Sequence, residues 1–178
     1  MVVCGRTDTL KELGDKLFFR KDIYLMIKSY QKFLESKQDI DSICKKYGIE
    51  NYTINQDGSI DVDGYVNLSN KRLTKLPLKF RNVGGHFYCY SNQLTTLEGS
   101  PQSVGGGFYC YRNQLTTLEG CPQSVGGNFY CYSNQLTTLE GSPQSVGGHF
   151  SCHSNQLKDF KGFPEFYEGD IDFSSNPV

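Results

Sequence analysis

Tyrosine, histidine and cysteine side chains recur along this chain at intervals of 21 residues. In one copy, Tyr88 and Tyr90 flank Cys89, and His86 precedes them. Tyrosine offers aromatic contact area and a hydroxyl group, histidine can transfer protons or bind a metal, and a cysteine thiol can bind a metal or form a disulfide. Which of these chemistries is open to the protein depends on the elements that hold the side chains.

The interval comes from an internal repeat with the core V-G-G-x-F-x-C-x-x-N-Q-L. A repeat of 20 to 29 residues is the signature of a solenoid, in which each copy buries its apolar side against its neighbours. The sequence predicts a solenoid domain over residues 62–178 with one parallel β-strand per rung. The rungs are residues 62–82, 83–103, 104–124, 125–145 and 146–166, with a partial rung at 167–178.

The apolar spacing within a rung resembles that of the leucine-rich repeat, L-x-L-x-x-N-x-L-x-x-L. Phe87 and Cys89 stand at the first two leucine positions, Asn92 at the asparagine, and Leu94 and Leu97 at the last two leucines. The resemblance covers residues 62–178. Similar short repeats occur in bacterial and bacteriophage proteins and in secreted bacterial effectors, so the resemblance implies a bacterial or phage setting and a binding function.

Strand alternation predicts where the repeated side chains point. If Phe87 and Cys89 face inward, the residues between and beside them face outward onto the concave side of the solenoid. A contiguous exposed aromatic surface is typical of an interaction site. The predicted partner-binding residues are Tyr88, Tyr90, Tyr109, Tyr111, Arg112, Tyr130, Tyr132, His86, His149 and His153.

The repeated cysteines and asparagines are better explained by structure than by chemistry. Cysteine occupies a core leucine position in four rungs, and free cysteine is among the most buried residue types, so we expect a buried column rather than disulfides or a metal site. We expect the asparagine amides to bond backbone groups at the bend after each strand. These columns are Cys89, Cys110, Cys131 and Cys152, and Asn92, Asn113, Asn134, Asn155 and Asn176.

Catalysis and cofactor binding find little support in the sequence. It contains no P-loop and no H-E-x-x-H or G-x-S-x-G motif. His149 and His153 could meet Asp170 or Asp172 of the next rung in a zinc or proton-transfer site, but no nucleophile accompanies them. We therefore predict a protein that is not an enzyme, with no catalytic residue, metal or cofactor.

Residues 1–61 are predicted to form a helical cap and a β-hairpin, because a solenoid end needs a cover. Three helices are expected within residues 8–48: one starting at Thr7 or Asp8, a second with an apolar face, and a third capped by Asp39 and stopped by Gly48. The apolar face of the second comprises Ile23, Met26, Ile27, Tyr30 and Leu34. Residues 52–54 and 60–62 alternate around a turn and predict the hairpin.

Composition narrows the functional classes. The formal net charge of the 178 residues is -1, which gives no electrostatic footprint for a nucleic-acid partner. The start lacks the apolar core of a signal peptide and no apolar run is long enough to span a bilayer, so we expect a cytoplasmic protein without membrane contact.

Three functions remain open. The first is recognition of another protein through the tyrosines, as an inhibitor or adaptor that acts on a host protein. The second is binding of a small planar molecule, such as a nucleotide, between the tyrosine rings. The third is assembly of a homo-oligomer through the solenoid ends, where Phe160, Phe163 and Phe166 add apolar surface.

Overall fold

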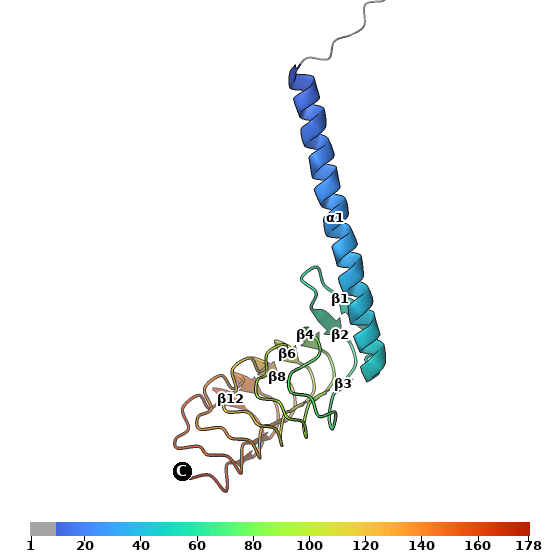
Figure 1. The fold of residues 1–178 in the computed structure, drawn as a ribbon. Coiled ribbons are helices and arrows are strands. Elements are labelled where there is room, and N and C mark those ends of the chain that lie inside the picture. Colours follow the sequence, from blue (N-terminus) through green and yellow to red (C-terminus); the bar gives the residue numbers. More distant parts are fainter. Residues whose placement is uncertain (1–9) are drawn as a thin grey trace, which may run out of the picture. The chain divides into compact units, whose positions relative to one another are not determined.

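The computed structural model describes residues 10–178, with side chains from residue 20 onward. The chain divides into two compact units, Met1–Asp39 and Ile40–Val178. The first unit contains most of the helix α1 (Leu10–Tyr47), and the second contains the end of this helix and all the strands. Figure 1 shows the helix and the regular turns of the strand-bearing unit.

The helix α1 is continuous where the sequence predicted three helices. Neither proline nor glycine interrupts the sequence between Gly14 and Gly48, so each backbone N–H keeps its partner one turn earlier. Asp39 lies inside the helix and caps nothing, which corrects the expected break at that residue. The expected start at Thr7 or Asp8 lies outside the described residues.

Gly48 ends the helix as predicted. Its φ of 65° is in the left-handed region, where glycine has no Cβ to clash. The N–H of Ile49 donates to the carbonyl of Cys44 at 2.9 Å, which is the bond expected of a glycine helix terminus. Ile49 is thereby turned into the core of the second unit, beside Ile40 and Cys44 from the last helical turns.

The predicted hairpin is confirmed. Strands β1 (Tyr52–Ile54) and β2 (Ile60–Val62) pair antiparallel, and β2 then pairs in parallel with β4 (Phe80–Val83). The Tyr52 hydroxyl donates to an oxygen of Asp41 at 2.7 Å, which ties the hairpin to the last turns of the helix. These elements cover the first rung of the solenoid.

The solenoid makes about five turns with a period of about 21 residues, and its parallel strands confirm the predicted fold class. The predicted strand is present in each rung, as Phe-Tyr in β5, β7 and β9, and a second short strand precedes it on another side of the turn. One sheet, here called sheet A, has the order β1-β2-β4-β6-β8-β10-β12, and the other, sheet B, has the order β13-β11-β9-β7-β5-β3. The remaining strands are β3 (Val66–Asn67), β5 (Phe87–Tyr88), β6 (Ser103–Val104), β7 (Phe108–Tyr109), β8 (Ser124–Val125), β9 (Phe129–Tyr130), β10 (Ser145–Val146), β11 (Phe150–Ser151), β12 (Phe166–Tyr167) and β13 (Ile171–Asp172).

The Gly-Gly pair of each repeat lies between the two strands of a rung, where adjacent rungs approach closely. A Cβ on Gly84 would lie 2.6 Å from the carbonyl oxygen of Asp63, and one on Gly85 would lie 2.9 Å from that of Gly64. Real side chains do not reach these separations, so glycine allows the close stacking seen in these rungs. In the last rung Glu168 takes the first-glycine position, and its N–H donates to the Val146 carbonyl at the longer distance of 3.2 Å. The bend between sheets A and B therefore follows directly from the repeat.

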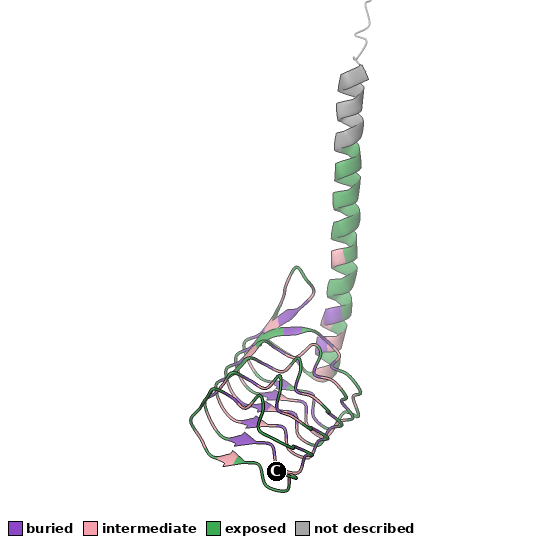
Figure 2. Cartoon of the chain, turned by 90° about the vertical axis from the view of Figure 1, so that its left-hand side faces the viewer, coloured by how far each residue is buried: buried purple, intermediate pink, exposed green. Residues whose placement is uncertain are grey.

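The interior consists of columns of identical side chains, one from each rung. Phe87, Phe108, Phe129 and Phe150 are fully buried, and successive rings stack with centroids 5.3–5.8 Å apart. The predicted cysteine column is confirmed as buried, and its thiols are free. Figure 2 shows this buried core along the strands.

The predicted asparagine column is confirmed as a structural device. Asn113 accepts from the N–H of Leu94 at 3.0 Å and donates to the carbonyls of Cys89 and Cys110, each at 3.0 Å. Asn134, Asn155 and Asn176 repeat the arrangement. The amides satisfy backbone groups at the bend after each sheet B strand, where the chain leaves the sheet.

Candidate functional site

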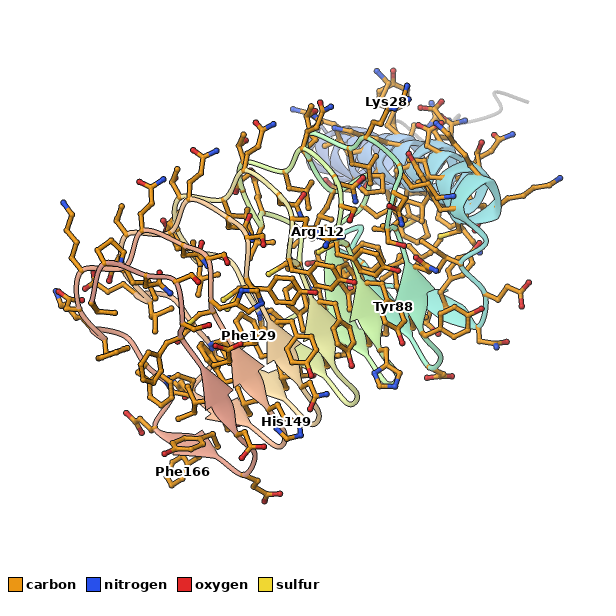
Figure 3. All side chains as sticks on the ribbon, turned by 90° about the horizontal axis from the view of Figure 1, so that it is seen from below. Lys28, Tyr88, Arg112, Phe129, His149 and Phe166 are labelled. Carbon is orange, nitrogen blue, oxygen red and sulfur yellow. The ribbon has the colours of Figure 1, made fainter. Side chains whose placement is uncertain are left out.

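The tyrosines lie on the outer side of sheet B. Phe87 and Cys89 point inward and are buried, whereas Tyr88 and Tyr90 alternate with them and are partly exposed. The other rungs repeat this alternation because the strands pair in register at the 21-residue period. We call this surface the tyrosine face and define it as Tyr88, Tyr90, Tyr109, Tyr111, Tyr130 and Tyr132. In Figure 3, Tyr88 and His149 mark the run of side chains along these strands.

One column of the tyrosine face is a continuous stack of rings. Tyr90 and Tyr111 have centroids 4.5 Å apart, Tyr111 and Tyr132 4.4 Å, and Tyr132 and His153 4.3 Å, with interplanar angles of 5° to 12°. Parallel strands about 4.8 Å apart bring equivalent rings to stacking distance. The structure thus brings His153 together with the tyrosines as a fourth member of the stack.

The second column is less uniform. Tyr88 and Tyr109 stack at 5.0 Å, whereas Tyr130 meets Tyr109 edge-on at 5.3 Å and 74°. The column then ends at Ser151, which is buried. Tyr109 lies over Gly107, where a Cβ would come within 2.5 Å of the tyrosine hydroxyl oxygen. The glycine at this repeat position, which is His86 in the preceding rung, makes room for the ring.

Stacking leaves the ring edges and hydroxyls as the exposed parts of the face. Burial raises the pKa of Tyr111 to about 12, with smaller contributions from Tyr132 and Tyr90. Burial also raises the pKa of Tyr109, and the neighbouring Tyr88 and Tyr130 raise it further by smaller amounts. Both hydroxyls are therefore neutral near pH 7, so they can donate and accept hydrogen bonds.

Two of the predicted site histidines make structural hydrogen bonds between rungs. His86 Nδ1 accepts from the N–H of Gly107 at 2.8 Å, and His149 Nδ1 accepts from that of Asp170 at 2.9 Å. In a rung between them, Asn128 Oδ1 accepts from the backbone N–H of His149 at 2.9 Å. Each imidazole therefore carries its proton on Nε2 and has only that edge left for a ligand. Sequence reasoning missed this role, although the recurrence of side chains with an acceptor atom at one repeat position was a signal for it.

Arg112 and His153 lie beside the stack of rings. Arg112 is exposed and has a φ of 54°, a left-handed conformation shared with Ser91, Ser133 and Ser154 in the other rungs. His153 Nδ1 lies 2.9 Å from the Ser154 hydroxyl oxygen. Arg112 thus adds one positive charge beside the tyrosine hydroxyls.

The other reactive groups do not form a chemical centre in the part of the chain that the structure describes. Burial raises the pKa values of the column cysteines, so their thiols are protonated. Among residues 20–178, no three His, Cys, Asp or Glu side chains gather in a way that could hold a metal ion. His149 Nδ1 lies 3.5 Å from a carboxylate oxygen of Asp170, but it already accepts the N–H of that residue.

Two pockets lie away from the tyrosine face. One, of about 420 Å³, is lined by Lys75, Leu76, Pro77, Leu78, Lys79, Glu98 and Gly99. The other, of about 320 Å³, is lined by Thr96, Glu98, Thr117, Glu119 and Gly120. Neither pocket includes a predicted site residue.

Comparison with protein-family models gives no match, and neither does comparison with curated proteins or with solved structures. Within residues 10–178, α1 lacks the uninterrupted apolar length that crossing a bilayer requires.

Proposed function

We propose that the protein is a non-enzymatic recognition module that binds another protein through its tyrosine face. The observation that carries this proposal is the ordered stack of Tyr90, Tyr111, Tyr132 and His153, whose side chains are partly exposed. Tyrosine gives contact area with little entropy left to lose, and stacking fixes the rings before a partner arrives. A surface prepared in this way favours binding.

The tyrosine face can form the centre of a protein interface. Its six tyrosines are each only partly exposed, so together they supply at most about half of the roughly 800 Å² on one side of a standard interface, and exposed residues beside them supply the rest. Tyr109 and Tyr111 occupy the middle rung, so we expect them to contribute most of the binding energy. The partner should offer apolar surface for the ring edges and polar groups for the hydroxyls.

The small-ligand alternative gains no support from the geometry. The stacked rings are already 4.3–4.5 Å apart, so their faces cover one another and leave no slot for a planar molecule. A protein that contacts the edges needs no such slot.

The biological setting is also part of this proposal. The repeat resembles leucine-rich repeats of bacterial and bacteriophage proteins, and we propose that the chain acts in the cytoplasm as an inhibitor or adaptor of a host protein. The resemblance rests on the five repeated positions represented by Phe87, Cys89, Asn92, Leu94 and Leu97. It supports a binding role because it supplies a scaffold and no catalytic motif.

The test is a comparison of partners captured by the wild-type chain and by two variants. In the first variant, Tyr109 and Tyr111 of the middle rung become serine, the residue that Ser151 already provides at the Tyr109 position of the repeat. In the control, the exposed Gln93, Gln114 and Gln135 of the same and the adjacent rungs become alanine. We expect one protein to be captured by the wild type and the control and lost by the serine variant.

With the purified partner, the change in Kd between the wild type and each variant can then be measured. Because central aromatic anchors contribute about 2 kcal/mol or more, the serine variant should weaken Kd by about 30-fold or more. Equal capture by all three proteins would contradict the proposal, since the partner would then bind elsewhere.

A further inference from the structure

The helix α1 carries an apolar stripe that stays exposed in its own unit. Figure 2 shows the described part of this helix as almost wholly exposed up to Asp39. The side chains of the stripe have exposed fractions between 41% and 65%. They are Ile23, Met26, Ile27, Tyr30 and Leu34, and we call them the helix stripe.

The spacing of three and four residues places these side chains on one face of the helix. Lys28, Lys32 and Glu35 lie on the opposite side of the helix. Tyr24 and Leu25 are further exposed apolar side chains outside the stripe. Most of the stability of a helix in water comes from packing such a face, and an uncovered stripe of this size is typical of an interaction site. We therefore expect another polypeptide segment to pack against this surface.

Charged residues at the two ends of the stripe favour a second copy of the same helix, in antiparallel orientation, as the segment that packs there. Asp22 lies one turn before Met26 on the stripe side, and Lys37 lies two turns after Tyr30 on the same side. In a parallel pair of such helices, Lys37 would face its own copy. In an antiparallel pair centred beside Tyr30, Lys37 of each chain meets Asp22 of the other.

We propose that residues 22–37 of α1 pair antiparallel with the same segment of a second copy of this chain, forming a two-fold dimer. About half of the roughly 200 Å² of each large side chain is available, so five of them supply about 500 Å² per chain. Two copies reach about 1,000 Å², which is the lower limit for a specific interface. In this pairing, Leu34 of one copy packs between Ile23 and Ile27 of the other.

The first test is the mass of the full-length chain by sedimentation velocity over a wide concentration range. The wild type should form dimers. Replacing Met26 and Tyr30 by glutamate should weaken the association by more than about 100-fold, because the dimer would have to bury unpaired charges. The matched control replaces Lys28 and Lys32 by glutamate on the opposite side of the helix and should remain dimeric. Retained protection of the buried solenoid thiols shows that each variant is folded.

The second test distinguishes antiparallel from parallel pairing of the two helices. Lys37→Asp and Asp22→Lys should each weaken the dimer by roughly three-fold or more, and the double variant should recover wild-type affinity because the pair is reversed rather than lost. In a parallel dimer the double variant would show no recovery.

Three results would overturn the inference. The wild type could remain monomeric at every concentration, or the double charge variant could fail to recover. A dimer could also survive the Met26 and Tyr30 changes but dissociate on Phe166→Ser and Phe173→Ser, which would place the contact at the exposed last rung of the solenoid.

Discussion

The column cysteines show how the solenoid core controls the reactivity of individual side chains. Cys89, Cys110, Cys131 and Cys152 are buried, and burial raises the pKa of each thiol, that of Cys152 to about 12. The thiolate is the reactive form of cysteine, so these residues are inert in the folded protein. Their role is to fill space between the phenylalanine and leucine columns.

Thiol labelling checks this directly. In native protein at pH 8, the four column cysteines and Cys44 should resist a soluble disulfide reagent, and denaturant should make all five react. A Cys121→Ser variant is the control, because Cys121 is only partly buried. Rapid native labelling of any column cysteine, located by mass spectrometry, would contradict the assigned packing.

The same thiols set an alkaline limit on stability. Their folded pKa values lie above the ordinary thiol value of about 8.5, so the unfolded chain loses these protons first as the pH rises. The stabilisation is complete below that ordinary value and is lost above it. The free energy of unfolding should therefore fall from about pH 9 upward.

The roles of single residues could be predicted where the repeat itself specified them. Asn113 and Cys110 stand at positions whose function follows from the spacing of apolar residues. The role of His86 could not be predicted, because its Nδ1 meets the Gly107 N–H only once the distance between rungs is known. Likewise, the tyrosine columns were visible in the sequence, but the coverage of one ring by the next depends on rotamers.

Among the elements, the bend at the glycine pair is the most sensitive. A Cβ on Gly105 would collide with the carbonyl oxygen of Gly84, whereas a Cβ on Gly64, the first-rung equivalent of Gly106, meets nothing within 4 Å. We expect Gly105→Ala to lower the free energy of unfolding by about 1–3 kcal/mol, and Gly64→Ala to leave it nearly unchanged. Urea denaturation of both variants tests this, and equal effects would count against the close stacking of the rungs.

The contact between the hairpin strand β2 and the solenoid strand β4 should become weaker at acidic pH. Arg81 forms an ion pair with Asp61, and this contact, followed by bonds from Asn55 and Asn82, lowers the pKa of the Asp61 carboxyl. Since the folded pKa is below the unfolded value of about 4, the stabilisation is complete above pH 4 and is lost as the pH falls through the lowered pKa. Asp61→Asn should flatten this part of the curve of unfolding free energy against pH, and an unchanged curve would exclude the pair as its cause.

The elements differ in how far sequence could specify them. The hairpin was correct in both strands, because its alternation and turn are local signals. The break at Asp39 was wrong because a capping side chain has no effect where the backbone stays helical. The sheet A strand of each rung was not foreseen, since two residues such as Ser103 and Val104 carry no periodicity of their own.

At the largest scale, the rungs of the solenoid should behave as interchangeable stacked units. Deleting residues 104–124 joins Ser103 to Val125 in the same register, so every remaining rung keeps an equivalent neighbour. We expect this protein to fold, to be shorter by about 4.8 Å in small-angle scattering, and to show a smaller denaturant dependence of unfolding. Deleting residues 104–113 is the control, because it breaks the register and should abolish thiol protection. Equal disruption by both deletions would contradict independent stacking.

Binding through the tyrosine face is tested most directly by photo-crosslinking from two positions in one rung. A benzoylphenylalanine replaces Tyr111 in one variant and the exposed Gln114 in the other, and both are irradiated in cells of the native host. The proposed function predicts one crosslinked protein from position 111 and none from position 114. Crosslinking from position 114 alone, or from neither position, would contradict binding at the tyrosine face.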